Sequence, residues 1–321
     1  MLFHGVLRFQ IVPALEFTPK IRRRKGFSEY NGRSAMKKKA SAYDLELRAS
    51  CLRMPQKPVL ERPAGEAIAM LVRRGLRPET TPGDVPFEQP PDDALADRLC
   101  GWLSHYGFRL FLRGAIGKPE GFLPGQTTRY LSRSQSESYA EALVELGLAE
   151  KISRGRFRMK RTARNFGGTL EWYVGRELRK FGFDVATNVK LHVPGCGGDL
   201  DVVAAAEGKL VYVELKSSPP KNLEAGEIAA FCDRLDVLRP DVSIFAVDTA
   251  LRLSDKILPM FLDEFRRRGH EIVKPARIAV QQWAITPHLY AVNGSRDLVA
   301  NVMKAVAEGF RALAPRSPNH H

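Results

Sequence analysis

Two short apolar segments, separated by a two-residue break, constrain the fold of this chain more than any other feature. Residues 199–205 and 209–216, broken by Glu207-Gly208, are rich in valine, leucine and alanine, as in neighbouring β-strands. If Glu207 and Gly208 form a two-residue hairpin turn, Ala206 opposes Lys209 and Asp201 opposes Glu214. A one-residue bulge would shift this register. The pattern therefore predicts a hairpin with two facing carboxylates.

Charged side chains enter this hairpin at one end only. Both faces of residues 209–216 are apolar until Glu214 and Lys216, as expected of a central strand covered on both sides. The neighbouring strand mirrors this, because Asp199 and Asp201 lead into an apolar run. A solvated surface hairpin would alternate polar and apolar residues along its whole length. The pattern favours a buried strand pair with a polar end.

The opposed carboxylates of Asp201 and Glu214 indicate a cation site. In this register their Cβ atoms would lie roughly 4.5–5.5 Å apart, where two negative charges repel each other. Carboxylate oxygens suit a hard ion such as Mg²⁺, and Mn²⁺ would substitute for it. Lys216 would project from the same face, roughly 6–7 Å further along the strand.

These residues resemble the motif of the PD-(D/E)XK nuclease superfamily. Asp201 is followed, after twelve residues, by Glu214-Leu215-Lys216, and an expected helix from about Thr169 supplies Glu171. The order of elements over residues 167–250 is also similar to that family's core. The sequence Gly-Gly-Asp-Leu-Asp departs from a literal Pro-Asp, since Leu200 precedes Asp201, and Asp199 remains a rival carboxylate.

The resemblance implies a fold, a metal and roles for the residues. The fold would be α/β, with a restriction-endonuclease-like mixed sheet flanked by helices. Asp201, Glu214, the Leu215 carbonyl and Glu171 would bind Mg²⁺, and Lys216 would orient or deprotonate water or stabilise phosphate charge. Hydrolysis would leave a 5′-phosphate and a 3′-hydroxyl.

Upstream residues suggest a mainly helical, winged-helix-like domain. Residues 62–76 are expected to form a helix, 79–93 a linker or long loop, and 92–113 an amphipathic helix. A short helix near 127–131 and a third that ends at Gly147 would precede a basic hairpin centred on Gly155. The hairpin residues expected to contact DNA are Arg154, Arg156, Arg158 and Lys160. The alternative is that this domain only packs against other domains.

Charge supports a polyanionic partner, and DNA is the one expected. The chain of 321 residues has a net charge of +14, of which residues 1–40 contribute +8 from ten Lys or Arg against two Glu. We expect a basic, loosely packed segment over 1–60, the winged-helix-like domain over 61–164 and the nuclease domain over 165–315. Residues 250–315 would either extend the nuclease sheet or build a dimer face. His320 and His321 resemble a purification-tag remnant and are left out of the metal argument.

Other function classes are disfavoured by what the sequence lacks. We expect no membrane segment, because no apolar stretch approaches roughly 20 residues. We expect no signal peptide, because the start of the chain lacks a basic n-region and an Ala-x-Ala-like cleavage site. Four cysteines without a Cys-x-x-Cys pair predict a reducing, cytoplasmic setting without structural zinc.

The function expected is a Mg²⁺-dependent DNA endonuclease that acts in restriction, defence or repair of branched DNA. A Holliday-junction resolvase would be a specific version, and it would require a homodimer with two active sites. The alternative is a catalytically silent DNA-binding protein that retains the nuclease fold. An RNA enzyme is disfavoured, since no aromatic platform is evident.

Overall fold

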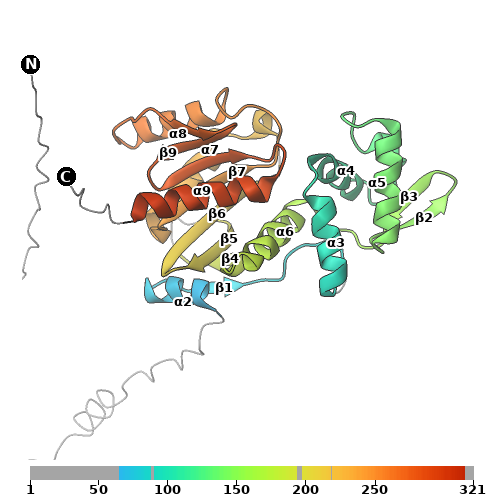
Figure 1. Ribbon diagram of the computed structural model, residues 1–321, viewed down its shortest axis with the longest axis horizontal. Helices are drawn as coiled ribbons and strands as arrows, with labels where there is room; N and C mark the ends of the chain where they lie inside the picture. Colours follow the sequence, from blue (N-terminus) through green and yellow to red (C-terminus); the bar gives the residue numbers. More distant parts are fainter. Residues whose placement is uncertain (1–64, 88–89, 194–196, 218, 315–321) are drawn as a thin grey trace, which may run out of the picture. The chain divides into compact units, whose positions relative to one another are not determined.

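An eight-stranded mixed sheet organises the larger part of the protein (Figure 1). The computed structural model describes residues 65–87, 90–193, 197–217 and 219–314, so the expectations for residues 1–60 and for His320 and His321 lie outside it. The strand order is β1-β4-β5-β6-β7-β10-β9-β8. Strands β6 and β10 run parallel to β7, and the other pairs are antiparallel. The strands are β1 (Pro78–Thr80), β4 (Asp184–Leu191), β5 (Asp199–Ala206), β6 (Lys209–Lys216), β7 (Val242–Val247), β8 (Ala276–Ala279), β9 (Gln282–Thr286) and β10 (Leu289–Asn293).

Helices cover both faces of this sheet. One face packs against α6 (Gly167–Lys180) and α9 (Leu298–Leu313), and the other against α2 (Glu66–Arg73), α7 (Ala225–Leu238) and α8 (Ile257–Arg267). Strand β6 shows why both layers are needed. Val211 and Val213 belong to the first apolar core, whereas Leu210 and Tyr212 belong to the second. The expected α/β class, with a mixed sheet flanked by helices, is confirmed.

The expected order of elements around the motif is confirmed. Helix α6 precedes β4, β5 and β6, and α7 leads into β7. The chain after residue 250 extends the sheet, because β10 pairs with β7 and carries β9 and β8 outward. Of the two alternatives for this tail, the sheet extension is the one observed.

Residues 65–80 attach to the sheet rather than to the helices that follow them. Residues 79–93 were expected to form a linker or loop, yet Glu79 and Thr80 belong to β1, which pairs antiparallel with β4. Helix α2 buries Ala67 and Leu71 in the same core as β4 and β5. The three-residue strand has a half-buried or exposed pattern, so no apolar run announces it. The segment 65–80, which precedes α3 in the chain, therefore belongs to the sheet and not to the helical region.

The helical region contains α3 (Asp93–Leu103), α4 (Tyr106–Ile116), η1 (Pro124–Gln126) and α5 (Arg133–Glu145). A hairpin follows, formed by β2 (Ala149–Ser153) and β3 (Arg156–Met159). Ser132 caps α5 in a capping box with Gln135. Three α-helices thus precede the hairpin, although they are not the three that were expected, and the winged-helix-like domain stays a prediction.

Two helix predictions in this region were wrong. Residues 92–113 do not form one helix, because the chain breaks at Ser104 and His105. The buried Arg109 donates to the carbonyls of Leu103 and Ser104, at 2.6 and 3.0 Å, and so satisfies the end of α3. The short helix expected near 127–131 is absent from the described residues there, and its place is taken by the 3₁₀ turn η1 at Pro124.

A buried ion pair joins the helical region to the sheet. Arg109 of α4 donates from Nε to Asp248 Oδ1 at 2.9 Å, and both side chains are fully buried. Arg113 adds a second contact to Asp248, at 2.7 Å. Asp248 directly follows β7, and its amide donates to the Lys216 carbonyl at 2.8 Å. The helical region is therefore fastened next to the polar end of β6.

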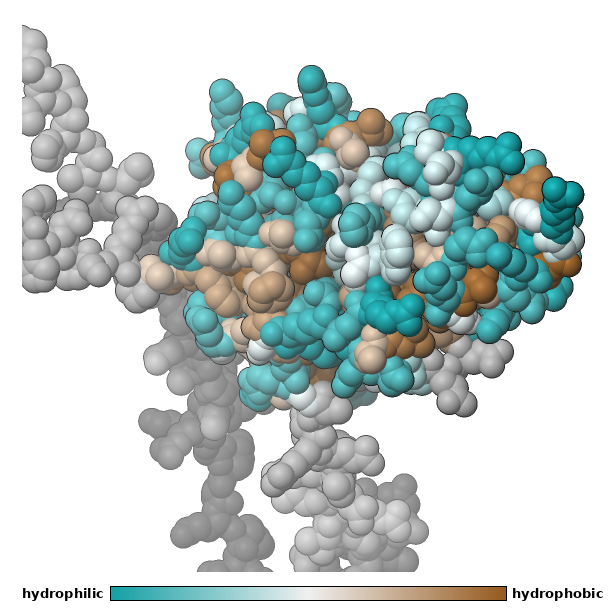
Figure 2. All heavy atoms as spheres, turned by 45° about the vertical axis from the view of Figure 1, so that its right-hand side comes forward, coloured by the Kyte–Doolittle hydropathy of each residue, from teal (hydrophilic) through white to brown (hydrophobic). Residues whose placement is uncertain are grey.

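On the face of the molecule that Figure 2 shows, hydrophobic side chains are interspersed with hydrophilic ones.

Among the described residues, no helix combines the length and the apolar character needed to cross a membrane.

Candidate active site

The β5–β6 hairpin adopts the register that the turn length predicts. Glu207 and Gly208 both have positive φ, 52° and 69°, as a type I′ turn requires. Ala206 lies opposite Lys209, and the pairing continues to Val202 opposite Val213. The ladder ends there, one pair before Asp201 and Glu214. Instead, Asp201 Oδ2 accepts the Leu215 amide at 2.6 Å, so a side chain bridges the strands where the backbones separate.

Strand β4 is also irregular at this level. Asn188 falls between the paired residues Thr187 and Val189 and has a φ of 51°, a left-handed conformation that asparagine tolerates. Its carbonyl accepts the Thr81 amide at 3.2 Å, which brings the segment after β1 beside the polar end of the sheet. The irregularity lies at the level of Asp201, because Thr187 pairs with Val202 and Val189 with Leu200.

Glu214 is buried, and both of its carboxylate oxygens are occupied. Oε1 accepts Arg234 Nη2 at 2.7 Å and lies 3.0 Å from Lys216 Nζ. Oε2 accepts the Tyr212 hydroxyl. Burial, together with the charges of Glu214 and Asp201, raises the pKa of Tyr212, so that its hydroxyl stays protonated and can donate. The carboxylate is thus held by two cations and a phenol.

Lys216 ends β6 and lies between two carboxylates. Its Nζ is 3.0 Å from Glu214 and 2.9 Å from Glu227 of α7. Burial would lower the pKa of Lys216, but the Glu214 and Glu227 charges and hydrogen bonds outweigh it and raise that pKa. Lys216 is therefore a fixed positive charge at the rim of the site.

Glu171 comes from the first turns of α6. Asp84 packs against the start of this helix so closely that a Cβ added at Gly168 would lie 2.4 Å from the Asp84 carbonyl oxygen. Burial, then repulsion from Asp199 and Glu214, raises the pKa of Glu171 to about 7. Among the described residues Glu171 has no hydrogen-bond or ion-pair partner. It is an uncompensated carboxyl group held next to other carboxylates.

Asp201 experiences the same repulsion. Burial, then the charges of Glu214 and Glu171, raises the pKa of Asp201 well above its usual range. The Leu215 amide and Lys216 act in the opposite direction without cancelling this effect. Because these carboxyl groups are buried next to one another, their charged forms are disfavoured unless a further cation neutralises them.

These side chains line one open pocket of about 450 Å³. It brings together all four residues that the sequence singled out as catalytic. It also contains residues that the sequence analysis did not select. The lining residues are Asp84, Arg164, Asn165, Gly168, Glu171, Asn188, Gly198, Asp199, Asp201, Glu214, Lys216 and Arg234.

The oxygen donors fit a hard divalent cation, but they are not arranged as a finished cage. Within the described ranges, no three Asp, Glu, His or Cys side chains converge closely enough to hold a metal ion. Glu214 is instead engaged by Arg234 and Lys216. The fit rests on the donor chemistry and on the repulsion between Asp201, Glu171 and Glu214. Metal binding would require Glu214 to relax its contacts with these cations.

Arg234 is the most important residue that the sequence analysis missed. It lies on the buried side of α7, between Phe231 and Leu238. Its signal in the sequence was an arginine at a position where the helical period calls for an apolar residue. Asp84 and Asn188 gave no comparable signal, because a loop and a strand kink brought them to the pocket.

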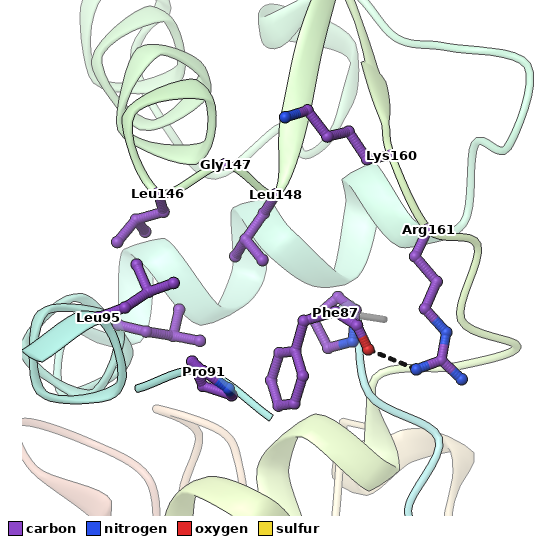
Figure 3. Close-up of a pocket in the computed structure, with 10 residues that line it drawn as sticks. Phe87, Pro91, Leu95, Leu146, Gly147, Leu148, Lys160 and Arg161 are labelled. Carbon is purple, nitrogen blue, oxygen red and sulfur yellow. Dashed lines mark hydrogen bonds between the residues drawn. The ribbon is translucent and has the colours of Figure 1, made fainter. Parts of the chain in front are cut away.

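The basic hairpin presents its cations unevenly. Arg158 lies 2.7 Å from Glu150 across the hairpin, and Arg156 donates to the Glu120 carbonyl at 3.2 Å. Arg154 is exposed and has no ion-pair partner among the described residues. Lys160 follows β3 and points away from the apolar side chains of a second pocket, whereas its neighbour Arg161 donates to the Phe87 carbonyl (Figure 3). The part of these residues in DNA binding stays a prediction.

Comparison with known proteins identifies no relative by sequence. No family model matches the chain, and no curated protein sequence is similar to it. Among solved structures, the protein VC1899 from Vibrio cholerae is 15% identical to this chain and has a TM-score of 0.47. The match covers 76% of this chain and 62% of VC1899. Can2 from Sulfobacillus thermosulfidooxidans, solved with cyclic tetra-adenylate, is 17% identical and has a TM-score of 0.41. This match covers 75% of this chain and 59% of Can2. This chain thus spans less than two thirds of either protein, and we transfer no ligand, activity or residue role from them.

Proposed function

We propose that this protein is a metal-dependent nuclease that hydrolyses phosphodiester bonds in DNA. One observation carries the proposal: Asp201, Glu214, Lys216 and Glu171 line a single pocket at the open end of a buried strand pair. Structural ion pairs normally balance charge. Here the pKa values of Asp201 and Glu171 are raised instead, because the two carboxyl groups are buried and lie next to other carboxylates.

The carboxylates would hold the metal. Asp201, Glu214 and Glu171, together with the Leu215 carbonyl, would bind Mg²⁺, and Mn²⁺ would substitute for it. The ion would polarise the scissile phosphate and lower the pKa of a bound water. Asp201 is already anchored by the Leu215 amide, which fixes the direction of its free oxygen.

Lys216 would stabilise negative charge on the phosphate rather than remove a proton. In the metal-free protein the charges of Glu214 and Glu227 outweigh burial and raise the pKa of Lys216, which favours the protonated ammonium for this role. Its salt bridges to Glu214 and Glu227 hold the ammonium at the rim of the pocket, within reach of a phosphate oxygen.

DNA is the substrate that the charge distribution favours. The chain carries a net charge of +14, and the hairpin cations Arg154, Arg156, Arg158 and Lys160 would bind the phosphate backbone. The helical region would then deliver DNA to a site to which it is fastened through Arg109 and Asp248. Restriction or defence and the repair of branched DNA are both compatible with this arrangement.

A second candidate function is a catalytically silent DNA-binding protein. The observation that favours it is the engagement of Glu214 by Arg234 and Lys216, together with the absence of a ready metal cage among the described residues. In that case the cations would replace the metal permanently, and the fold would serve only to bind DNA.

A cleavage assay separates the two candidates. Wild-type protein and Glu214→Ala are incubated with linear, supercoiled, single-stranded and branched DNA in Mg²⁺ or Mn²⁺. The nuclease cuts at least one substrate only with metal, and the variant, shown to be folded by its thermal unfolding, does not. If neither protein cuts while both bind DNA in a salt-dependent manner, the silent DNA-binding function is correct.

A further inference from the structure

A buried arginine occupies the wall of the candidate site. Arg234 is 6% exposed and shares the inner face of α7 with Ile228, Phe231 and Leu238. Arginine is almost never buried unless its charge is paired, because removing the guanidinium from water is costly. The contacts of Arg234 therefore indicate what it is needed for.

Each side of the guanidinium has an acceptor. Nη2 donates to Glu214 Oε1 at 2.7 Å, Nε to the Tyr212 hydroxyl at 2.9 Å, and Nη1 to the Gly197 carbonyl at 2.9 Å. Tyr212 in turn donates to Glu214 Oε2. Arg234 thus engages one oxygen of Glu214 directly and the other through Tyr212. Three anchors fix its charge beside this carboxylate.

Lys216, the other cation on Glu214, is held less firmly. It is at the rim of the pocket and has Glu227 as a second partner, so its ammonium can remain paired without Glu214. Arg234 has no other carboxylate within salt-bridge distance among the described residues. If a divalent cation is to share Glu214, it must do so next to the Arg234 charge.

We propose that Arg234 is the internal counter-ion of Glu214 and that it limits the affinity of the candidate site for a divalent cation. This inference rests on the proposed function. Arg234 is a positioning residue, because it acts through Glu214. It stabilises the metal-free fold by neutralising a buried carboxylate, and it repels a second cation from the same oxygens.

The test is a calorimetric titration of metal-free protein with Mn²⁺, which needs no turnover. Wild type, Arg234→Gln and Arg234→Lys are compared, and the exposed Arg311→Gln serves as a control for lost charge far from the pocket. Arg234→Gln is expected to bind Mn²⁺ roughly tenfold more tightly, while Arg234→Lys and Arg311→Gln stay near wild type. A purely structural role would leave the affinity of Arg234→Gln unchanged or lower it, and either result overturns the inference.

The same titration distinguishes failure of the inference from failure of the nuclease proposal. Mn²⁺ binding by wild type with no gain in Arg234→Gln contradicts only the role of Arg234. If none of the proteins binds Mn²⁺, the metal site is contradicted and, with it, the proposed nuclease.

Folding of the variant is followed by near-ultraviolet circular dichroism and thermal unfolding. If Arg234→Gln is unfolded without metal, Mn²⁺ is expected to restore the folded signal, because the ion replaces the missing counter-charge. A variant that stays unfolded at saturating Mn²⁺ overturns the inference.

Discussion

At the scale of single residues, the charged groups of the candidate site are unevenly paired. Asp201, Glu171 and Glu214 share a pocket with Lys216 and Arg234, but the cations are directed at Glu214. Glu171 is left without a partner among the described residues, and its pKa rises to about 7. The site is therefore expected to respond strongly to pH and to divalent cations.

We predict that Glu171→Gln reduces the pH dependence of stability in metal-free buffer. Since the pKa of Glu171 is higher in the folded than in the unfolded protein, the folded state binds the proton more tightly. This contribution to stability is present below pH ~4.3 and is lost as pH rises to about 7. Thermal unfolding should thus show the variant as more stable than wild type at pH 8 and similar to it at pH 4.

The role of Glu171 as a metal ligand is checked in the same experiment. Added Mn²⁺ at pH 8 should raise the melting temperature of wild type more than that of Glu171→Gln. Equal pH profiles for the two metal-free proteins would show that Glu171 is not held against its neighbours in the way we describe.

Asp248 gives the second prediction at this scale. It is fully buried and is the carboxylate for both Arg109 and Arg113, so Asp248→Asn leaves Arg109 buried without a counter-charge. We expect the free energy of unfolding, measured with urea, to fall by about 3–5 kcal/mol. The matched control is Asp263→Asn, which removes an exposed partner of Arg266 and should change little. Similar effects of both substitutions would refute the anchoring role of Asp248.

At the scale of elements, local rules predicted the β5–β6 hairpin and the helices around the sheet, but they failed at the break between α3 and α4. A two-residue turn with positive φ at Glu207 and Gly208 leaves one register for β5 and β6. Asp201, Glu214 and Lys216 could therefore be found from the sequence. The break between α3 and α4 could not, because it depends on Arg109 and its distant partner Asp248. Arg234 was missed for the same reason, since its partners lie on β6 and before β5.

Helix α9 packs against β7 so closely that one glycine is required. A Cβ added at Gly309 would lie 2.5 Å from a methyl carbon of Val242, which is too short for a normal contact. Gly309→Ala should therefore lower the free energy of unfolding by about 1–3 kcal/mol, through overpacking.

A glycine-to-alanine substitution should raise the free energy of unfolding where the added Cβ meets no neighbouring atom. Gly226 of α7 has no atom within 4 Å of its added Cβ, so Gly226→Ala should gain up to about 1 kcal/mol from helix propensity. Urea unfolding of both variants measures the difference. Stabilisation by Gly309→Ala would contradict the packing of α9 described here.

At the scale of the whole molecule, a basic helical region lies next to an acidic pocket. The hairpin cations differ in availability, because Arg158 is paired with Glu150 whereas Arg154 has no ion-pair partner among the described residues. We predict that Arg154→Ala weakens DNA binding and lowers the slope of log K against log salt by about 1. Arg158→Ala should have a smaller effect. If neither variant alters the slope, the hairpin does not contact the DNA backbone.

The most direct test of the account is single-turnover cleavage of end-labelled DNA by wild type and by Asp201→Asn, with Mg²⁺ or with a chelator. The substitution keeps the shape of the side chain and removes one negative charge from the candidate metal site. We predict Mg²⁺-dependent cutting by wild type that leaves a 5′-phosphate and a 3′-hydroxyl. Asp201→Asn should be slower by more than about 100-fold while its melting temperature is no lower than that of wild type. Cleavage at the same rate by both proteins, or undiminished in the chelator, would contradict the account.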